Sequence, residues 1–333
     1  MNTKLEQLLE LVYGMPEVCV EEALKSMTEI IESHEATKTT KPCPHCQSEN
    51  VVRNGKKDGK QRYYCSGCKK TFTDTTNTVS YNSHYGEAVW NQVTRDTLEG
   101  QSLDKTAEKL GLSHQTVFNM RHKILMALEQ EETRNPTKLG GVSELDETYV
   151  LESLKGTKFQ ADYWRGPRKH GAVAKRAGIS QEYIGICAGV ERKGAAVSVA
   201  VGRSVPEGAD IAYVFGKRLD EQTLVLCDGA KSYNILSFDG KCEVAAVPSG
   251  KDVKTDSFYN INTVNNFHGH IQERYRSYRG VATKYLNRYG ILFAKSFKCS
   301  EHTVNELCKL LMSTNVSRFN SIDSVTSKNL LDF

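Results

Sequence analysis

The sequence predicts an α/β protein in which a mixed sheet with helices is preceded by two small modules. Three observations predict this architecture. Short β-rich runs separated by helical segments fill the chain from about residue 140 onward. Two Cys-x-x-Cys pairs lie in a basic stretch near the N-terminal end, and a helix-turn-helix pattern lies between this stretch and the β-rich region. At 333 residues the chain is long enough for two or three domains, so a single small binding module is excluded.

Composition places the chain among cytoplasmic globular proteins. Hydrophobic residues make up 39% and charged residues 25%, and no run approaches the roughly 18 to 20 apolar residues that span a bilayer. Residues 1–10 lack the basic and apolar pattern of an export signal. The cysteines outside the two pairs are scattered, which fits reduced thiols better than a disulfide framework. We expect a cytoplasmic protein without a membrane partner.

Residues 1–35 form an acidic arm with eight Glu and two Lys. Apolar residues recur there at helical spacing on both sides of a break at residues 14–16, which predicts two amphipathic helices. These helices either pack on the rest of the chain or contact another subunit, and their charge argues against DNA contact.

Residues 40–76 read as a zinc ribbon. The pairs Cys43-x-x-Cys46 and Cys65-x-x-Cys68 supply four thiolates, which suit the tetrahedral coordination of Zn²⁺. Residues 41–75 hold eight Lys and Arg against three acids, so the ribbon carries about +5. The ribbon is therefore predicted to face a polyanion such as DNA, or otherwise to brace its neighbours.

Residues 83–132 form a helical block with the pattern helix, tight turn, helix. Gly111 lies at the turn, Ser113 is a natural N-cap for the second helix, and Val117 faces back into the core. The residues expected to enter a major groove are Ser113, His114, Gln115, Thr116 and Asn119, and those expected to reach phosphate are Arg121, His122 and Lys123. An ordinary helical hairpin is the alternative.

From residue 140 onward the pattern changes to strands. Strands are predicted at 142–150, 183–190, 195–201 and 224–227, and helices at about 209–219 and 263–279. Three antiparallel strands, a helix and a strand that ends at an acid follow the order of a ribonuclease-H-like core. We place this core at residues 140–300 and a closing helix and tail at 301–333.

Two aspartates occupy chemically important positions in the predicted sheet. Asp146 lies inside the first strand with Leu145 and Glu147 on the opposite face, and Asp228 follows the strand at 224–227. Paired carboxylates at neighbouring strand ends can bind a divalent cation that activates water and stabilises the leaving oxygen of a phosphodiester. Taken alone, Asp228-Gly229 also fits an ordinary turn.

The motifs together resemble a family of insertion-sequence transposases, the family numbered fifteen-ninety-five. The resemblance covers about residues 40–300 and rests on the ribbon, the helical block and a set of short motifs. These motifs are Glu144-x-Asp146-Glu-Thr-Tyr149, Lys175-Arg-Ala-Gly-Ile-Ser180, Cys227-Asp-Gly229, Thr263-Val-Asn-Asn-Phe-His268 and Arg279-Gly-Val-Ala-Thr-Lys-Tyr-Leu286. The resemblance implies a ribonuclease-H-like catalytic domain that cuts transposon ends and joins them to target DNA.

The resemblance also implies the active-site residues. Asp146 and Asp228 match the first two catalytic acids, and the third position falls on Asn265; one branch of the family is similar in having asparagine there, and others have glutamate. These three residues would hold Mg²⁺ or Mn²⁺, and the amide would bind it less tightly than a carboxylate. Gln272 stands where relatives often have lysine. Asn265 could otherwise be an N-cap or surface amide, and Glu273 is a rival third ligand that shares the helix face poorly.

Basic residues follow the third position and also fill the loop near residue 170. Arg274, Arg276 and Arg279 are predicted DNA contacts, while Arg165 and Arg168 belong to the loop. The partners expected from the resemblance are double-stranded DNA at the element ends and the target, and a second copy of this chain on that DNA. The host would be a bacterium or archaeon and the protein would be nucleoid-associated. The competing hypothesis is a zinc-dependent DNA-binding regulator with an inactive catalytic domain.

Overall fold

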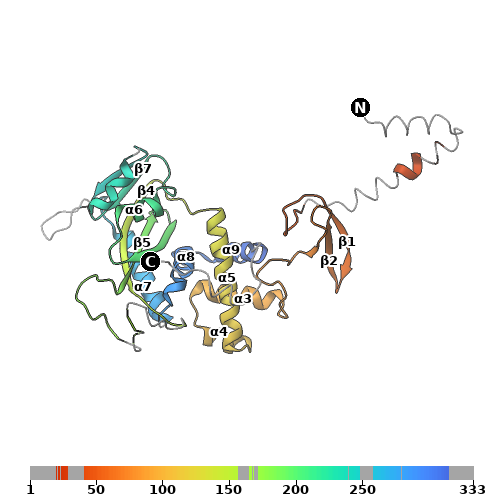
Figure 1. The fold of residues 1–333 in the computed structure, drawn as a ribbon, viewed down its shortest axis with the longest axis horizontal. Coiled ribbons are helices and arrows are strands. Elements are labelled where there is room, and N and C mark those ends of the chain that lie inside the picture. The colour runs from red at the N-terminus through yellow and green to blue at the C-terminus, as the bar shows by residue number, and fades with distance from the viewer. Residues whose placement is uncertain are drawn as a thin grey trace. The chain divides into compact units, whose positions relative to one another are not determined.

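The computed structural model describes residues 41–156, 165–166, 168, 172–238, 240–247, 258–278 and 280–314, together with 20, 22 and 24–28. The chain divides into two compact units, which we call the ribbon unit (Met1–Thr76) and the larger unit (Asn77–Phe333) (Figure 1). Most of the predicted acidic arm and the tail from residue 315 onward lie outside the described residues.

The ribbon unit contains a three-stranded antiparallel sheet. Its strands are β1 (Val51–Lys57), β2 (Lys60–Cys65) and β3 (Thr71–Thr73). Asp58 and Gly59 join β1 to β2 with φ angles of 51° and 75°, the backbone of a type I′ hairpin turn. The buried residues of this small sheet are Cys43, Val51, Tyr63, Cys65 and Phe72.

Three helices open the larger unit: α3 (Glu87–Glu99), α4 (Leu103–Leu110) and α5 (His114–Arg134). Gly111 ends α4 with a φ of 64°, and the Ser113 hydroxyl accepts the backbone N–H of Thr116 at the start of α5. Val117 is fully buried and Ala107 nearly so. These local contacts confirm the predicted helix, turn and helix, including the N-cap.

A five-stranded sheet follows the helices. Its elements are β4 (Val142–Leu151), β5 (Tyr183–Glu191), β6 (Ala196–Arg203), α6 (Gly208–Phe215), β7 (Thr223–Cys227), the 3₁₀ helix η1 (Lys231–Ser237) and β8 (Cys242–Ala246). The spatial order is β6-β5-β4-β7-β8; β4, β5 and β6 pair antiparallel, whereas β7 pairs parallel to β4 and β8 parallel to β7. This is the ribonuclease-H-like strand order that the sequence predicts.

Helices cover both faces of this sheet. One face carries α7 (Asn262–Ser277) and α8 (Leu286–Ser296), with the short 3₁₀ helix η2 (Thr283–Tyr285) between them; α9 (Glu301–Ser313) packs against α3. Alternate residues of β5, among them Ile184 and Ile186, join a core with Phe267, Phe293 and the helices α3 and α5. The other face packs Leu145 and Cys187 against α6 and η1. The helical block therefore shares a core with the sheet.

The element boundaries differ from the predicted ones at a few places. Helix α6 ends at Phe215, and residues 216–219 turn so that Leu219 bridges to Leu139. Strand β8 was not predicted, because its five residues include Glu243 and show weak alternation. Among the described residues, none of the helices is both long and apolar enough to cross a membrane.

Candidate functional site

The candidate active site lies where α7 runs along β4. Every second residue of β4 faces this helix, whereas Leu145 between them is buried on the opposite face. Successive residues on this face of β4 contact successive turns of α7. They join Glu144 to Thr263 and Val264, Asp146 to His268, and Thr148 to Gln272.

Asp146 and Asp228 come from neighbouring parallel strands. Glu144 of β4 pairs with Leu226 of β7; Asp146 lies two residues after Glu144 within β4, and Asp228 lies two residues after Leu226, just past the end of β7. Asp228 follows β7 directly, and its Oδ1 accepts the backbone N–H of Ala230 at 2.9 Å. This turn leaves the Asp228 side chain exposed at the carboxyl edge of the strand.

Asn265 is an exposed residue in the first turn of α7. It stands three and seven residues before His268 and Gln272, the spacing that places side chains on one stripe of a helix. His268 Nδ1 lies 3.7 Å from Asp146 Oδ2, so this stripe faces β4. The backbone N–H of Asn265 donates to Ile261, so Asn265 is not the N-cap of the helix.

Glu144 fixes the start of α7 against the sheet. Its carboxylate is fully buried and accepts the backbone N–H groups of Thr263 and Val264 at 2.6 and 3.0 Å, as well as the Thr263 hydroxyl. Arg192 Nε donates to the same carboxylate at 2.7 Å and its Nη2 to the carbonyls of Phe258 and Asn260. A buried acid at a helix N-terminus is favourable because it satisfies free N–H groups. Sequence analysis missed this role, since Glu144 and Thr263 are 119 residues apart.

The electrostatics of the site reflect burial and crowding of like charges. Burial raises the pKa of Asp146 to about 6, and the nearby charge of Asp228 adds to the rise. Burial lowers the pKa of His268 to about 4, so its imidazole is neutral at pH 7, and its Nε2 is buried without a hydrogen-bond partner. The two aspartates thus lie close enough to repel one another.

The donor set suits a hard divalent cation. Two carboxylates and an amide oxygen are ligands that Mg²⁺ or Mn²⁺ accepts, and a cation would relieve the repulsion between Asp146 and Asp228. Among the described residues, the only group of three or more His, Cys, Asp or Glu ligands within reach of one ion is a cysteine cluster. Within that described part, no such group contains Asp146 and Asp228 together with a third ligand of these types.

Three polar neighbours have other roles. Glu147 faces the opposite side of β4 beside Tyr233, as its strand position predicts, and burial raises its pKa. Gln272 Nε2 donates to Thr148 Oγ1 and to the Tyr149 carbonyl at 3.1 and 3.0 Å, so this amide ties α7 to β4. Glu273 is exposed along an outer groove of α7, away from the site.

The predicted base-reading residues lie at the start of α5. Ser113, His114 and Gln115 are exposed, and Gln115 Nε2 donates to Asn119 Oδ1 at 2.9 Å. Thr116 is partly exposed and bonded to the Ser113 hydroxyl. The end of the helix that is predicted to enter a groove is therefore open to solvent.

Several predicted phosphate contacts are occupied elsewhere. Arg121 and His122 are each only 1% exposed, and Arg121 donates to the Gln101 carbonyl, so in this fold neither reaches a surface phosphate. Arg274 donates to the carbonyls of Leu98 and Glu99, where it caps α3. Lys123 is half-buried with its ammonium 5.7 Å from the Trp90 ring centre, Arg276 is exposed beside the outer groove of α7, and Arg279 lies outside the described residues.

The arginines of the loop near residue 170 form buried ion pairs. Arg165 and Arg203 both bind the Glu152 carboxylate at 2.9 Å, and Arg168 binds Glu182 at 3.2 Å. The sequence places no acid beside these arginines in the loop itself. Their partners lie next to the ends of neighbouring strands, so the charges of Arg165 and Arg168 are paired within the fold.

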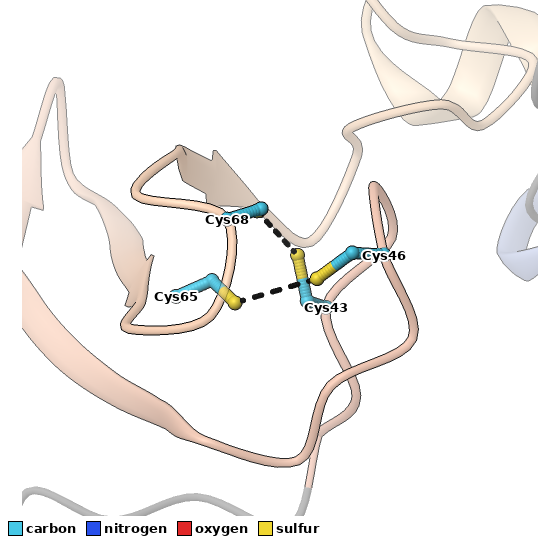
Figure 2. A group of neighbouring side chains, drawn as sticks. All are labelled: Cys43, Cys46, Cys65 and Cys68. Carbon is cyan, nitrogen blue, oxygen red and sulfur yellow. Dashed lines mark hydrogen bonds between the residues drawn. The ribbon is translucent and has the colours of Figure 1, made fainter.

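The second candidate site is the cysteine cluster of the ribbon unit. Figure 2 shows Cys43, Cys46, Cys65 and Cys68 converging from two loops, with Sγ–Sγ distances of 3.6 Å for Cys43–Cys68 and for Cys46–Cys65. All four sulfur atoms lie within 4.8 Å of one another. Four thiols at these separations match the edge lengths of a tetrahedral site with metal–sulfur distances of about 2.3 Å.

The two loops of the cluster have the same backbone structure. The N–H of Gln47 donates to the Cys43 carbonyl at 2.8 Å, and the N–H of Lys69 donates to the Cys65 carbonyl at 2.9 Å. Both Gln47 and Lys69 have positive φ angles, 61° and 60°. Backbone N–H groups of Cys68 and Gly67 lower the pKa of the Cys65 thiol to about 6, which favours the thiolate that binds a metal.

Two family models of known proteins match segments of this chain that contain the two candidate sites. Residues 38–69 match the family model of the InsA N-terminal domain, a zinc ribbon, and residues 138–294 match the ISXO2-like transposase domain. A protein of Halobacterium salinarum, described as an uncharacterized protein in transposable element ISH50, is 26% identical over 250 residues, which cover 74% of this chain and 82% of that protein.

Two of the solved structures with some similarity are Mos1 complexes. The Mos1 strand transfer complex is 15% identical, with 69% of this chain and 78% of that chain covered and a TM-score of 0.26. The Mos1 transposase paired-end complex with left transposon end is 14% identical, with 70% and 80% covered and the same TM-score of 0.26. These scores are too low to add to the fold assignment, which rests on the strand order.

Proposed function

Because residues 138–294 belong to the ISXO2-like transposase domain family, we propose that this chain binds the terminal inverted repeats of an insertion sequence and catalyses cleavage and strand transfer there. The single observation that supports catalysis is that the charge of Asp228, which follows β7, acts on Asp146 in the neighbouring parallel strand β4, beside the α7 stripe that carries Asn265. The reaction would take place in the cytoplasm, at the nucleoid.

Asp146, Asp228 and Asn265 are the residues that would hold Mg²⁺ or Mn²⁺. When bound, divalent ions supply an activated nucleophile and charge stabilisation for the leaving oxygen of the phosphodiester. Neighbouring side chains position this site. His268 lies beside the Asp146 carboxylate. Glu144, together with Arg192, holds the first turn of α7 against β4.

DNA binding is assigned to the ribbon and to the start of α5. The ribbon carries about +5, and His114 and Gln115 are exposed at the N-terminal end of the second helix. Zinc held by the four cysteines would have a structural role, because all four positions are taken by protein ligands. Inverted repeats are symmetric, so two copies of the chain would act together on double-stranded DNA.

One observation favours a second candidate, a DNA-binding regulator without catalytic activity. The third position is an amide, and Gln272, where a basic residue is expected, serves as a structural tie between α7 and β4. A site with fewer charges holds its cation less tightly, and weak metal binding would leave DNA binding as the main activity.

Metal-dependent nicking of a plasmid that carries the element ends separates the two candidates. A transposase cuts this plasmid with Mg²⁺ or Mn²⁺, and Asp146→Ala and Asp228→Ala stop cutting but keep DNA binding. We expect a loss of about 10³-fold or more, since metal-held charge stabilisation is worth several kcal/mol. Asn265→Asp should retain cutting and Asn265→Ala should lose it. Tight binding of the ends without any cutting would establish the regulator instead.

A further inference from the structure

A cavity of about 660 Å³ lies in the larger unit between the α4–α5 pair and the segment that follows α7. Its size is that of a site for a small organic molecule. Helix α5 contributes Phe118, Arg121 and His122, and the segment after α7 contributes Tyr278, Lys284 and Tyr285. None of these residues has a part in the acid site.

Two of the polar residues that line this cavity have unmet hydrogen-bonding capacity. His122 is 1% exposed, and neither Nδ1 nor Nε2 has a partner. Arg121 is also 1% exposed; its Nη2 donates to Gln101, but its Nε donates to nothing. Buried polar groups without partners are rare because each reduces stability, so their presence on one cavity indicates that a polar molecule completes them.

Aromatic rings form a further part of the cavity lining. The Phe118 and Tyr285 ring centres lie 4.3 and 4.5 Å from the His122 ring, and the Arg121 guanidinium lies 5.3 Å from the centre of the Tyr278 ring. Aromatic faces and a guanidinium plane are the surfaces on which a flat heteroaromatic ring stacks. A nucleobase combines such a ring with a hydrogen-bonding edge that Arg121 and His122 can satisfy.

The charge of the cavity favours an anionic group beside that ring. Burial, followed by the charges of Arg288, Arg121 and Lys284, lowers the pKa of His122 to about 3, so cations lie near this imidazole. Lys284 Nζ donates to the Gly156 carbonyl and lies over the Tyr285 ring. Asp104 also lines the cavity, but its carboxylate is 86% exposed and lies 3.7 Å from His114. A phosphate therefore fits near Lys284.

We propose that this cavity binds one unpaired nucleotide of the DNA that the chain contacts, with the base stacked on Phe118 and Tyr285 beside Arg121 and His122, and its phosphate near Lys284. The assignment rests on the proposed DNA binding by the α4–α5 pair. Position supports it, because His114 lines the same cavity and also stands at the exposed start of α5. A strand displaced from the duplex at that helix end is close to the cavity mouth.

Three short duplexes of one sequence test the proposal with the full-length, zinc-loaded chain. The first is fully paired, the second carries one unpaired adenine nucleotide, and the third carries an abasic sugar-phosphate at the same place. We expect the unpaired adenine to raise affinity by about tenfold over both other duplexes, the order that one base stacked on an aromatic side chain contributes. The abasic duplex controls for the easier bending of an interrupted helix.

Two variants and a matched control locate the effect. Phe118→Ala removes a stacking face, and His122→Phe keeps the ring but removes both unpaired nitrogen atoms. Both should abolish the preference for the unpaired adenine and leave affinity for the paired duplex unchanged. His122→Phe should also preserve or raise the melting temperature, so loss of the preference in this variant cannot be a loss of folding. Phe238→Ala removes an exposed phenylalanine outside the cavity and should keep the preference.

The remaining outcomes are distinct. Equal affinity of the wild type for all three duplexes overturns the nucleotide site while leaving DNA binding intact, whereas no binding of any duplex overturns the proposed function itself. If free deoxyadenosine monophosphate binds as tightly as the unpaired duplex and Phe118→Ala removes that binding, the cavity serves a free nucleotide and the assignment to DNA is wrong.

Discussion

The ribbon unit and the larger unit use a metal site in opposite ways. In the ribbon unit, Cys43 and Cys65 are two of only five buried core residues, so the cluster forms much of the core. In the larger unit the core extends over both faces of a five-stranded sheet, and Asp146 and Asp228 belong to neither of its two buried clusters. A small domain buries too little apolar surface to fold without a staple, whereas a large one does not need its cation to fold.

Because of this difference, replacing a metal ligand should change the free energy of unfolding in opposite directions at the two sites. The cysteines contribute folding energy when metal is bound, so replacing one costs stability. The aspartates repel one another in a partly buried place, so replacing one should relieve strain in the metal-free protein. The proposed cation site, rather than stability, would account for two acids at this place.

The largest expected effect is on the ribbon. Removing zinc with a chelator, or replacing Cys65 with Ser, should unfold residues 41–76, because structural zinc binding is worth about 10–16 kcal/mol in small zinc modules. The melting of the larger unit should shift by less than about 1 °C. Amide hydrogen exchange resolved by segment measures both units at once. If the ribbon kept its protection from hydrogen exchange without zinc, the cysteine cluster would not be required for its folding, which would contradict this account.

A smaller effect is expected at the support of the acid site. Glu144→Ala should destabilise the larger unit by about 3–5 kcal/mol, because it leaves Arg192 and the first N–H groups of α7 without their partner. Urea unfolding monitored in the larger unit provides the measurement. Glu273→Ala, on the exposed face of the same helix, is the matched control and should change stability by less than about 0.5 kcal/mol. Equal effects of the two substitutions would remove Glu144 from its positioning role.

The smallest effect is a gain. Asp146→Asn should stabilise the metal-free larger unit by about 1–2 kcal/mol at pH 7, since burial and Asp228 raise the pKa of Asp146 to about 6. A carboxyl whose pKa is raised on folding costs stability above that pKa, and the cost disappears as pH falls below the unfolded value near 4. The advantage of the variant should therefore shrink between pH 7 and pH 4.

Urea unfolding at several pH values with and without Mg²⁺ tests this expectation. Saturating Mg²⁺ should stabilise the wild type but not Asp146→Asn, which reverses their order. A variant that is less stable than the wild type in the absence of metal, at every pH, would contradict the account of repulsion.

The sequence predicted those features that depend on local chemistry. Ser113 caps α5 because its hydroxyl bonds an N–H three residues on, and Asp146 faces α7 because strand residues alternate. Features that depend on distant partners were missed or wrongly assigned. The sequence predicts that Arg274 contacts DNA, whereas in the fold it donates to a carbonyl at the end of α3. The sequence places Arg165 in a basic loop, whereas in the fold its charge is paired with Glu152. Glu144 gave no local signal for its contacts with α7.

The central claim is that Asp146, Asp228 and Asn265 form one site for a divalent cation. A crystal of the full chain soaked in Mn²⁺ tests it most directly, because anomalous scattering locates the ion. The account predicts Mn²⁺ bound by carboxylate oxygens of Asp146 and Asp228 at about 2.0–2.6 Å, with the Asn265 amide oxygen in the same shell. Mn²⁺ bound elsewhere would contradict it. So would a separation of more than about 10 Å between the three groups, because the ligands of one ion each lie about 2.0–2.6 Å from it.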